Sequence, residues 1–205
     1  MANVNMERGI EYTWGSTPEE RLMSFPCDRY INSSDEAYFR AIDVKAPMQI
    51  LFRWLCQLKV GSYSYDWLDH LERMFFKVQE SIPAHPSPKQ LLPSVENLAL
   101  GQRVMGIFKL VEFEQNRHLT IVIDDKQAIS IFGDIAASYV IFPITPHTCR
   151  LVLKGHIRYP KNRLWSWIRW VLPWGDLLMM RKQFLRLKNL AESQANCSCE
   201  LKVEG

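Results

Sequence analysis

The 205-residue chain lacks the features that mark several large classes of protein. No window approaches the roughly 18 consecutive apolar residues of a membrane-spanning helix. Residues 1–8 have no apolar core of the kind that a secretion signal carries. The five cysteines are an odd number without the regular spacing of a disulfide framework. These absences lead us to expect reduced thiols and a cytoplasmic protein.

Motifs for nucleotide, nucleophilic and metal chemistry are also missing. The nine glycines are dispersed, and neither a G-x-G-x-x-G nor a Walker pattern occurs. No G-x-S-x-G turn is present, and the five histidines lack H-x-H or H-E-x-x-H spacing. Cys197-Ser-Cys199 is a single C-x-C without a second ligand pair, which favours incidental thiols over zinc. We therefore expect no cofactor and no metal.

The charge balance argues against nucleic acid as a partner. The net charge is +3, from 25 basic and 22 acidic residues, whereas nucleic-acid-binding domains carry clustered Lys and Arg and a strong basic excess. The length and the 47% hydrophobic content suit one globular domain. We expect an N-terminal arm over residues 1–36, a single domain over 37–193 and a flexible tail over 194–205.

The first part of the domain is predicted to contain one strand and two short helices. Residues 38–45 alternate in the manner of a strand. Apolar residues at 50, 51, 54, 55 and 58 predict a half-buried helix that ends before Gly61. A second short helix is predicted over residues 66–78, with Asp66 in its first turn. Four prolines make residues 81–93 an extended loop.

The rest of the domain is predicted to be an antiparallel sheet followed by a long helix. Strand-like segments cover residues 104–113, 119–123, 128–132, 137–145 and 149–159. The connections between them are short and polar, which is typical of hairpins and excludes parallel pairing. A helix over residues 176–193, capped by Asp176, is the only predicted element long enough to cover the sheet. The sequence thus predicts an α+β fold with a helix packed on a curved sheet.

The segment Tyr63-Ser64-Tyr65-Asp66-Trp67-Leu68 concentrates three aromatic residues and one acid. One interpretation is structural, with the aromatic rings fixing the second helix to the sheet. The other is functional, with Tyr63 and Tyr65 turned into an apolar pocket, where their hydroxyls orient the polar end of a ligand.

Short motifs also follow one another along residues 14–192 in a recognisable order. They are Trp14-Gly15-Ser16-Thr17, the segment 42–47, Trp54-Leu55 with Gln57, the segment 63–68, the segment 100–104 and Met179-Met180-Arg181-Lys182. Together they resemble the polyketide cyclase/dehydrase-like, START-like proteins of the SRPBCC superfamily. The resemblance implies a helix-grip fold, in which a curved antiparallel sheet of about seven strands wraps a long C-terminal helix and encloses a cavity.

On this resemblance we expect the cavity to bind a small hydrophobic, aromatic or lipid-like molecule. The pocket residues that we predict are Trp54, Tyr63, Tyr65, Phe108, Tyr139, Phe142, Met180 and Phe184. An alternative is a cyclase- or dehydratase-type enzyme that uses the same cavity, with Tyr65, Asp66 or His156 as acid or base. The sequence leaves the ligand and the oligomeric state open.

Residues 164–174 hold four of the seven tryptophans beside several basic residues. This segment either forms a lid over one end of the cavity or contacts a membrane surface, because Trp favours the membrane interface and Lys and Arg attract anionic headgroups. The second interpretation makes a membrane-peripheral lipid carrier a third possible function.

Overall fold

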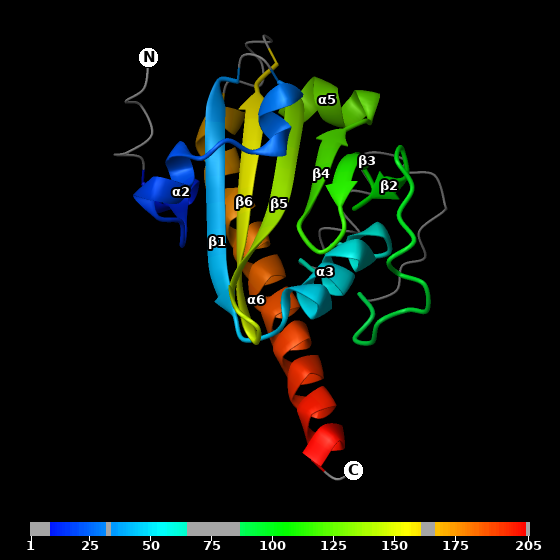
Figure 1. Ribbon diagram of the computed structural model, residues 1–205. Coiled ribbons are helices and arrows are strands. Elements are labelled where there is room, and N and C mark those ends of the chain that lie inside the picture. The colour runs from blue at the N-terminus through cyan, green and yellow to red at the C-terminus, as the bar shows by residue number, and fades with distance from the viewer. Residues whose placement is uncertain (1–8, 32–33, 65–86, 161–166, 204–205) are drawn as a thin grey trace.

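The computed structural model describes residues 9–31, 34–64, 87–160 and 167–203. An antiparallel sheet with strand order β1-β6-β5-β4-β3-β2 lies at its centre. Its strands are β1 (Glu36–Val44), β2 (Arg103–Val104), β3 (Phe108–Glu114), β4 (His118–Ile123), β5 (Asp134–Thr145) and β6 (Thr148–Arg158). A long helix, α6 (Ile168–Val203), crosses one face of the sheet (Figure 1). The predicted α+β helix-grip architecture is therefore confirmed.

The described sheet has six strands rather than about seven. Residues 128–132, predicted to be a strand, belong instead to helix α5 (Lys126–Phe132). The reason is Asp125, whose carboxylate accepts hydrogen bonds from the amides of Gln127 and Ala128 at 2.9 and 2.8 Å and so caps a helix. The predicted strand 104–113 is divided into β2 and β3 by a turn at Met105 and Gly106, both of which have positive φ angles.

The predicted helix over residues 50–58 appears as α3 (Met48–Cys56), which continues into a 3-10 turn, η2 (Gln57–Lys59). The second predicted helix, over residues 66–78, lies outside the described residues. Helix α6 begins eight residues before Asp176, so that Asp176 lies within the helix rather than at its cap. It also continues to Val203, which makes the expected flexible tail helical over residues 194–203. None of the described helices is long and apolar enough to cross a membrane.

Three short helical turns precede the sheet: α1 (Ile10–Thr13), α2 (Pro18–Leu22) and η1 (Pro26–Arg29). A capping box starts α2, because Thr17 and Glu20 each accept a hydrogen bond from the other's backbone amide. Helix α1 packs beside β1 and α6, and the chain then crosses to the opposite face of the sheet, where η1 contacts β4, β5 and β6 (Figure 1). The expected arm thus wraps the β1 edge.

We call the side of the sheet that α3 and α6 cover the helix face, and the opposite side the arm face. Alternate residues of each strand serve the two faces. On the helix face, Leu151 and Tyr139 belong to the main core cluster, together with Leu55 of α3 and Leu187 of α6. On the arm face, Phe25, Cys27 and Ile31 pack against Phe39 and Val152 in a smaller cluster.

Candidate ligand-binding site

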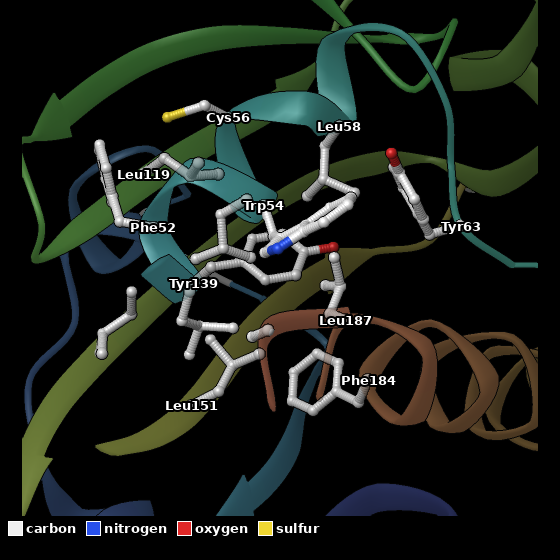
Figure 2. Packing of buried hydrophobic residues seen from close by; sticks show 14 of the residues in the cluster. Phe52, Trp54, Cys56, Leu58, Tyr63, Leu119, Tyr139, Leu151, Phe184 and Leu187 are labelled. Carbon is white, nitrogen blue, oxygen red and sulfur yellow. The ribbon is translucent and has the colours of Figure 1, made fainter. Parts of the chain in front are cut away.

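Four of the eight predicted pocket residues converge on the helix face. Trp54 comes from α3, Tyr139 from β5 and Phe184 from α6, and Tyr63 follows η2 (Figure 2). The rings of Trp54 and Tyr63 form an edge-to-face pair with centroids 6.2 Å apart, and the Tyr139 and Phe184 centroids are also 6.2 Å apart. The side-chain periods of the strand and of the two helices thus bring together residues that lie far apart in the sequence.

The polar groups of these aromatic side chains are occupied by protein partners. Trp54 Nε1 donates to Gln194 Oε1 at 2.9 Å, and the Tyr139 hydroxyl donates to Gln183 Oε1 at 2.8 Å. The Tyr63 hydroxyl donates to the Pro88 carbonyl at 2.9 Å and accepts from Gln57 Nε2 at 2.5 Å. Trp54, Tyr63 and Tyr139 therefore join elements of the core, which favours the structural interpretation of Tyr63.

The other four predicted residues differ in their positions. Phe108 and Met180 are partly buried at the border of the main core cluster. Phe142 packs on the arm-face cluster instead, so its placement in the pocket was wrong. The reason is the two-residue period of β5: Tyr139 and Ile141 point to the helix face, and Phe142 therefore points away from it. Tyr65 lies outside the described residues.

A buried ion pair on the helix face was not predicted from the sequence. Arg40, in the middle of β1, is fully buried, and its Nη2 donates to Asp176 Oδ2 of α6 at 2.5 Å. The same guanidinium donates to the carbonyls of Glu11 and Phe39 at 2.7 and 2.8 Å. Among the described residues, Arg40 Nε has no acceptor. The two-residue period of the strand could have indicated that Arg40 is buried, because Arg40 lies on the same side of β1 as Ile42 and Val44.

Asp176 keeps a quarter of its side-chain surface exposed (25%) beside the fully buried Arg40. Burial raises the pKa of Asp176 above its usual range, although the attraction and hydrogen bond of Arg40 act in the opposite direction. Burial, and after it the charge of Asp176, raises the pKa of Tyr139 as well. The hydroxyl of Tyr139 is thus electrostatically linked to the ion pair. Arg40, Tyr139, Asp176 and Gln183 form what we call the interior polar centre.

A cluster of hydroxyl groups continues this centre toward one end of the sheet. The hydroxyls of Tyr38 and Tyr159 are 2.7 Å apart, and both donate to Glu36 Oε2, at 3.0 and 2.7 Å respectively. The Arg40 guanidinium lies 5.6 Å from the centroid of the Tyr38 ring. Burial is the main cause that raises the pKa of both tyrosines, so both hydroxyls stay protonated and can donate hydrogen bonds.

His156, one of the predicted acid–base candidates, lies on the arm face and therefore points away from α6. Its Nε2 is 2.7 Å from Asp28 Oδ1, and its Nδ1 is 2.8 Å from Ser34 Oγ. This placement makes His156 unsuitable as an acid or base for a reaction on the helix face. Of the other two candidates, Tyr65 and Asp66, the structure describes neither.

Cys27, Asp28 and His156 offer ligand atoms that all lie within 4.8 Å of one another, a spacing compatible with a metal. However, Lys154 Nζ lies 2.8 Å from Asp28 Oδ1 and supplies the positive charge there. Burial also raises the pKa of the Cys27 thiol to about 11, so that this side chain is a poor anionic ligand. The cluster is best described as a hydrogen-bonded attachment of the arm to the sheet.

Comparisons with known proteins place the chain in no family. No family model matches it, and no curated protein matches its sequence. Among solved structures, the Zhui aromatase/cyclase from Streptomyces sp. R1128 is 10% identical, with 78% of this chain and 93% of that chain covered and a TM-score of 0.44. Norcoclaurine synthase from Thalictrum flavum is 9% identical over 83% of this chain and 93% of its own, with a TM-score of 0.44. A structural-genomics protein from Chromobacterium violaceum is 12% identical over 76% and 96% of the two chains, with a TM-score of 0.41. Likenesses this distant carry no inference about function.

Proposed function

We propose that this protein is a START-like helix-grip protein that binds a small apolar or aromatic molecule between its sheet and α6. The observation that carries the proposal is the state of Arg40. Its guanidinium is fully buried, yet Nε has no acceptor among the described residues. A buried donor without a partner costs about 1–3 kcal/mol. A ligand oxygen would remove that cost, and we therefore infer a ligand that carries a hydroxyl or carbonyl group.

The surroundings of Arg40 support a molecule that is otherwise apolar. Ile42 follows Arg40 on the same side of β1, and Met180 follows Asp176 by four residues on α6, which places it one helical turn further along. Both are only partly buried against the main core cluster. Small-molecule sites typically combine such apolar lining with a few placed polar groups. The exposed quarter of the Asp176 side chain supplies a second polar group for the ligand to meet.

The experiment uses 2-naphthol, a fluorescent aromatic probe with one hydroxyl group. We expect the wild-type protein to bind it, and an Arg40→Met/Asp176→Leu double variant to bind it about tenfold more weakly, since one hydrogen bond to a charged group is lost. A matched control is Arg158→Met/Asp134→Leu, which removes an exposed ion pair of 2.6 Å on β5 and β6 and should leave binding unchanged.

Two outcomes would contradict the proposal in distinguishable ways. If the wild-type protein binds no 2-naphthol and releases no apolar molecule for mass spectrometry after purification, ligand binding itself is wrong. If the Arg40→Met/Asp176→Leu variant binds as tightly as the wild type, binding stands but the interior polar centre does not orient the ligand.

A cyclase-type enzyme acting at the same centre is a second candidate, favoured by the raised pKa of Asp176. A carboxylate with a raised pKa is a stronger general base, and cyclisation of a ketone begins with removal of a proton next to the carbonyl. In this scheme Asp176 takes the proton from carbon, and the Arg40 Nε–H donates to the enolate oxygen.

Proton exchange tests this second candidate without knowledge of the natural substrate. In D2O, Asp176 would replace the methyl protons of 1-acetylnaphthalene with deuterium, which NMR detects. We expect exchange to fall to the uncatalysed rate in Asp176→Asn. If the wild type binds the ketone without accelerating the exchange, the protein is a binder and not an enzyme of this type.

A further inference from the structure

Trp167 and the first turns of α6, which directly follow it, expose several large apolar side chains. Trp170 is 82% exposed, and Trp167 and Trp174 are each 53% exposed. Val171 and Leu178 are more than half exposed as well. Residues at these spacings lie on one side of a helix. We call these five residues the tryptophan face: Trp167, Trp170, Val171, Trp174 and Leu178.

The tryptophan face is separate from the side of α6 that packs on the protein. Leu177 and Phe184 are buried, and Asp176 is turned toward Arg40. The start of α6 therefore has two apolar sides, one buried against the protein and one whose side chains stay more than half exposed. Exposed apolar patches rimmed by polar residues mark interaction surfaces.

The charges around the tryptophan face indicate the kind of partner. The segment 167–182 contains three basic residues, Arg169, Arg181 and Lys182, of which Arg169 pairs with Asp35 at 3.0 Å. Its one acidic residue, Asp176, is paired inward with Arg40 at 2.5 Å. Arg181 and Lys182 follow Leu178 by three and four residues, which places them next along the same side of the helix. The partner that matches is therefore apolar and anionic.

We infer that the tryptophan face docks on an anionic lipid surface, with α6 lying in the plane of the interface. Indole rings favour the boundary between headgroups and acyl chains, because each combines a large apolar area with an N–H donor. Basic residues beside the rings attract anionic headgroups. A second copy of the chain fits this surface less well, because a two-fold interface uses the same surface of both copies, and the tryptophan face contains no acidic side chain to pair with Arg181 and Lys182 of the other copy.

Vesicle co-sedimentation of the full-length protein tests this inference, with phosphatidylcholine vesicles and mixed phosphatidylcholine–phosphatidylserine vesicles as probes. We expect partition to the mixed vesicles and little partition to phosphatidylcholine alone. Trp170→Ala/Trp174→Ala should reduce the partition coefficient on the order of tenfold, because two exposed rings are lost. Arg181→Gln/Lys182→Gln should reduce it about fivefold for each charge removed, and only with the anionic vesicles.

Leu22→Ala/Leu100→Ala is the matched control, since Leu22 and Leu100 are 76% and 66% exposed elsewhere on the molecule. It should partition like the wild type. The substituted tryptophans, the leucines and Arg181 are exposed and Lys182 is half-buried, and circular dichroism and unfolding curves check that each variant keeps the wild-type fold. Absence of partition, or partition that survives Trp170→Ala/Trp174→Ala, would overturn the inference. So would a concentration-dependent dimer in sedimentation velocity that this variant abolishes, since the partner would then be a second copy.

Discussion

Each face of the sheet carries a buried cation beside a carboxylate, but the two pairs differ in how fully they are satisfied. On the arm face, Asp28 accepts hydrogen bonds from the Phe25 amide and from Lys154, and it contacts His156. On the helix face, Asp176 has one ion-pair partner among the described residues, Arg40. The Nε of Arg40 has no hydrogen-bond acceptor among those residues.

The difference appears in the titration of the two carboxyl groups. Burial raises the pKa of both, but at Asp28 the hydrogen bonds from Lys154, Phe25 and His156 outweigh it and hold the pKa below its usual range. At Asp176, burial is the larger effect and the pKa is raised. We therefore assign a structural role to the saturated Asp28–Lys154 pair, and we place the proposed ligand at the Arg40–Asp176 pair because one of its donors is unsatisfied.

The largest expected effect comes from breaking the helix-face pair. Arg40→Ala leaves Asp176 without its cation and should lower the free energy of unfolding by about 3–5 kcal/mol, as measured by urea denaturation. Arg40→Met/Asp176→Leu should recover most of that stability, because apolar side chains of similar size replace both charges. If the double variant is as unstable as Arg40→Ala, the pair is structural like the one on the arm face.

Breaking the arm-face pair should have a smaller effect on stability and none on ligand binding. Asp28→Ala leaves Lys154 buried without a carboxylate and should cost about 2 kcal/mol, reduced from the fully buried case because Asp28 is partly exposed. Hydrogen exchange should rise at the amides of Phe25 to Ile31. A change in 2-naphthol affinity would show that the two faces are coupled and would contradict their separation.

A neutral substitution on the arm face should have a weaker effect still. The Ser138 hydroxyl is buried, accepts from the Cys27 amide at 2.8 Å and lies 2.8 Å from Thr120 Oγ1. Ser138→Ala leaves that amide without its acceptor and should cost about 1 kcal/mol. Thr120→Val is the matched control, because among the described residues the one hydrogen bond given for the Thr120 hydroxyl is that to Ser138. It should cost less than Ser138→Ala in the same denaturation series.

Acidification should give the smallest effect and act in opposite directions on the two faces. Burial lowers the pKa of His156 below its ordinary 6.5, so the unfolded chain takes up that proton first as the pH falls. His156 therefore contributes stability that is present above pH 6.5 and declines below it. Burial raises the pKa of Asp176 above its ordinary 3.8, so the folded chain takes up that proton first, and stability from the helix face increases toward pH 3.8.

Unfolding curves measured across this pH range separate the two contributions. His156→Gln should flatten the loss of stability below pH 6.5. Asp176→Asn should remove the opposing gain and so make the loss steeper. If both substitutions change the slope in the same direction, the titrating groups on the two faces do not differ as we describe.

Local patterns in the sequence were sufficient for most of the fold. The alternation in residues 38–45, the apolar stripe of residues 50–58 and the short polar connections between strands predicted β1, α3 and antiparallel pairing. Two of the errors came from competing local signals. Asp125 caps a helix where Ile129 and Ile131 suggest a strand, and Asp176 looks like a cap but lies inside α6.

The sequence by itself determined the class of fold and the aromatic residues that fill the core, because hydrophobic periodicity acts over a few neighbouring residues. Only the tertiary structure decided which charges meet. Arg40 and Asp176 are 136 residues apart and approach to 2.5 Å across the sheet and α6, and Asp28 and His156 are 128 apart on the other face. Such pairing depends on strand register and on helix position, and a shift of one residue in β1 or β6 would move Arg40 or His156 to the opposite face of the sheet.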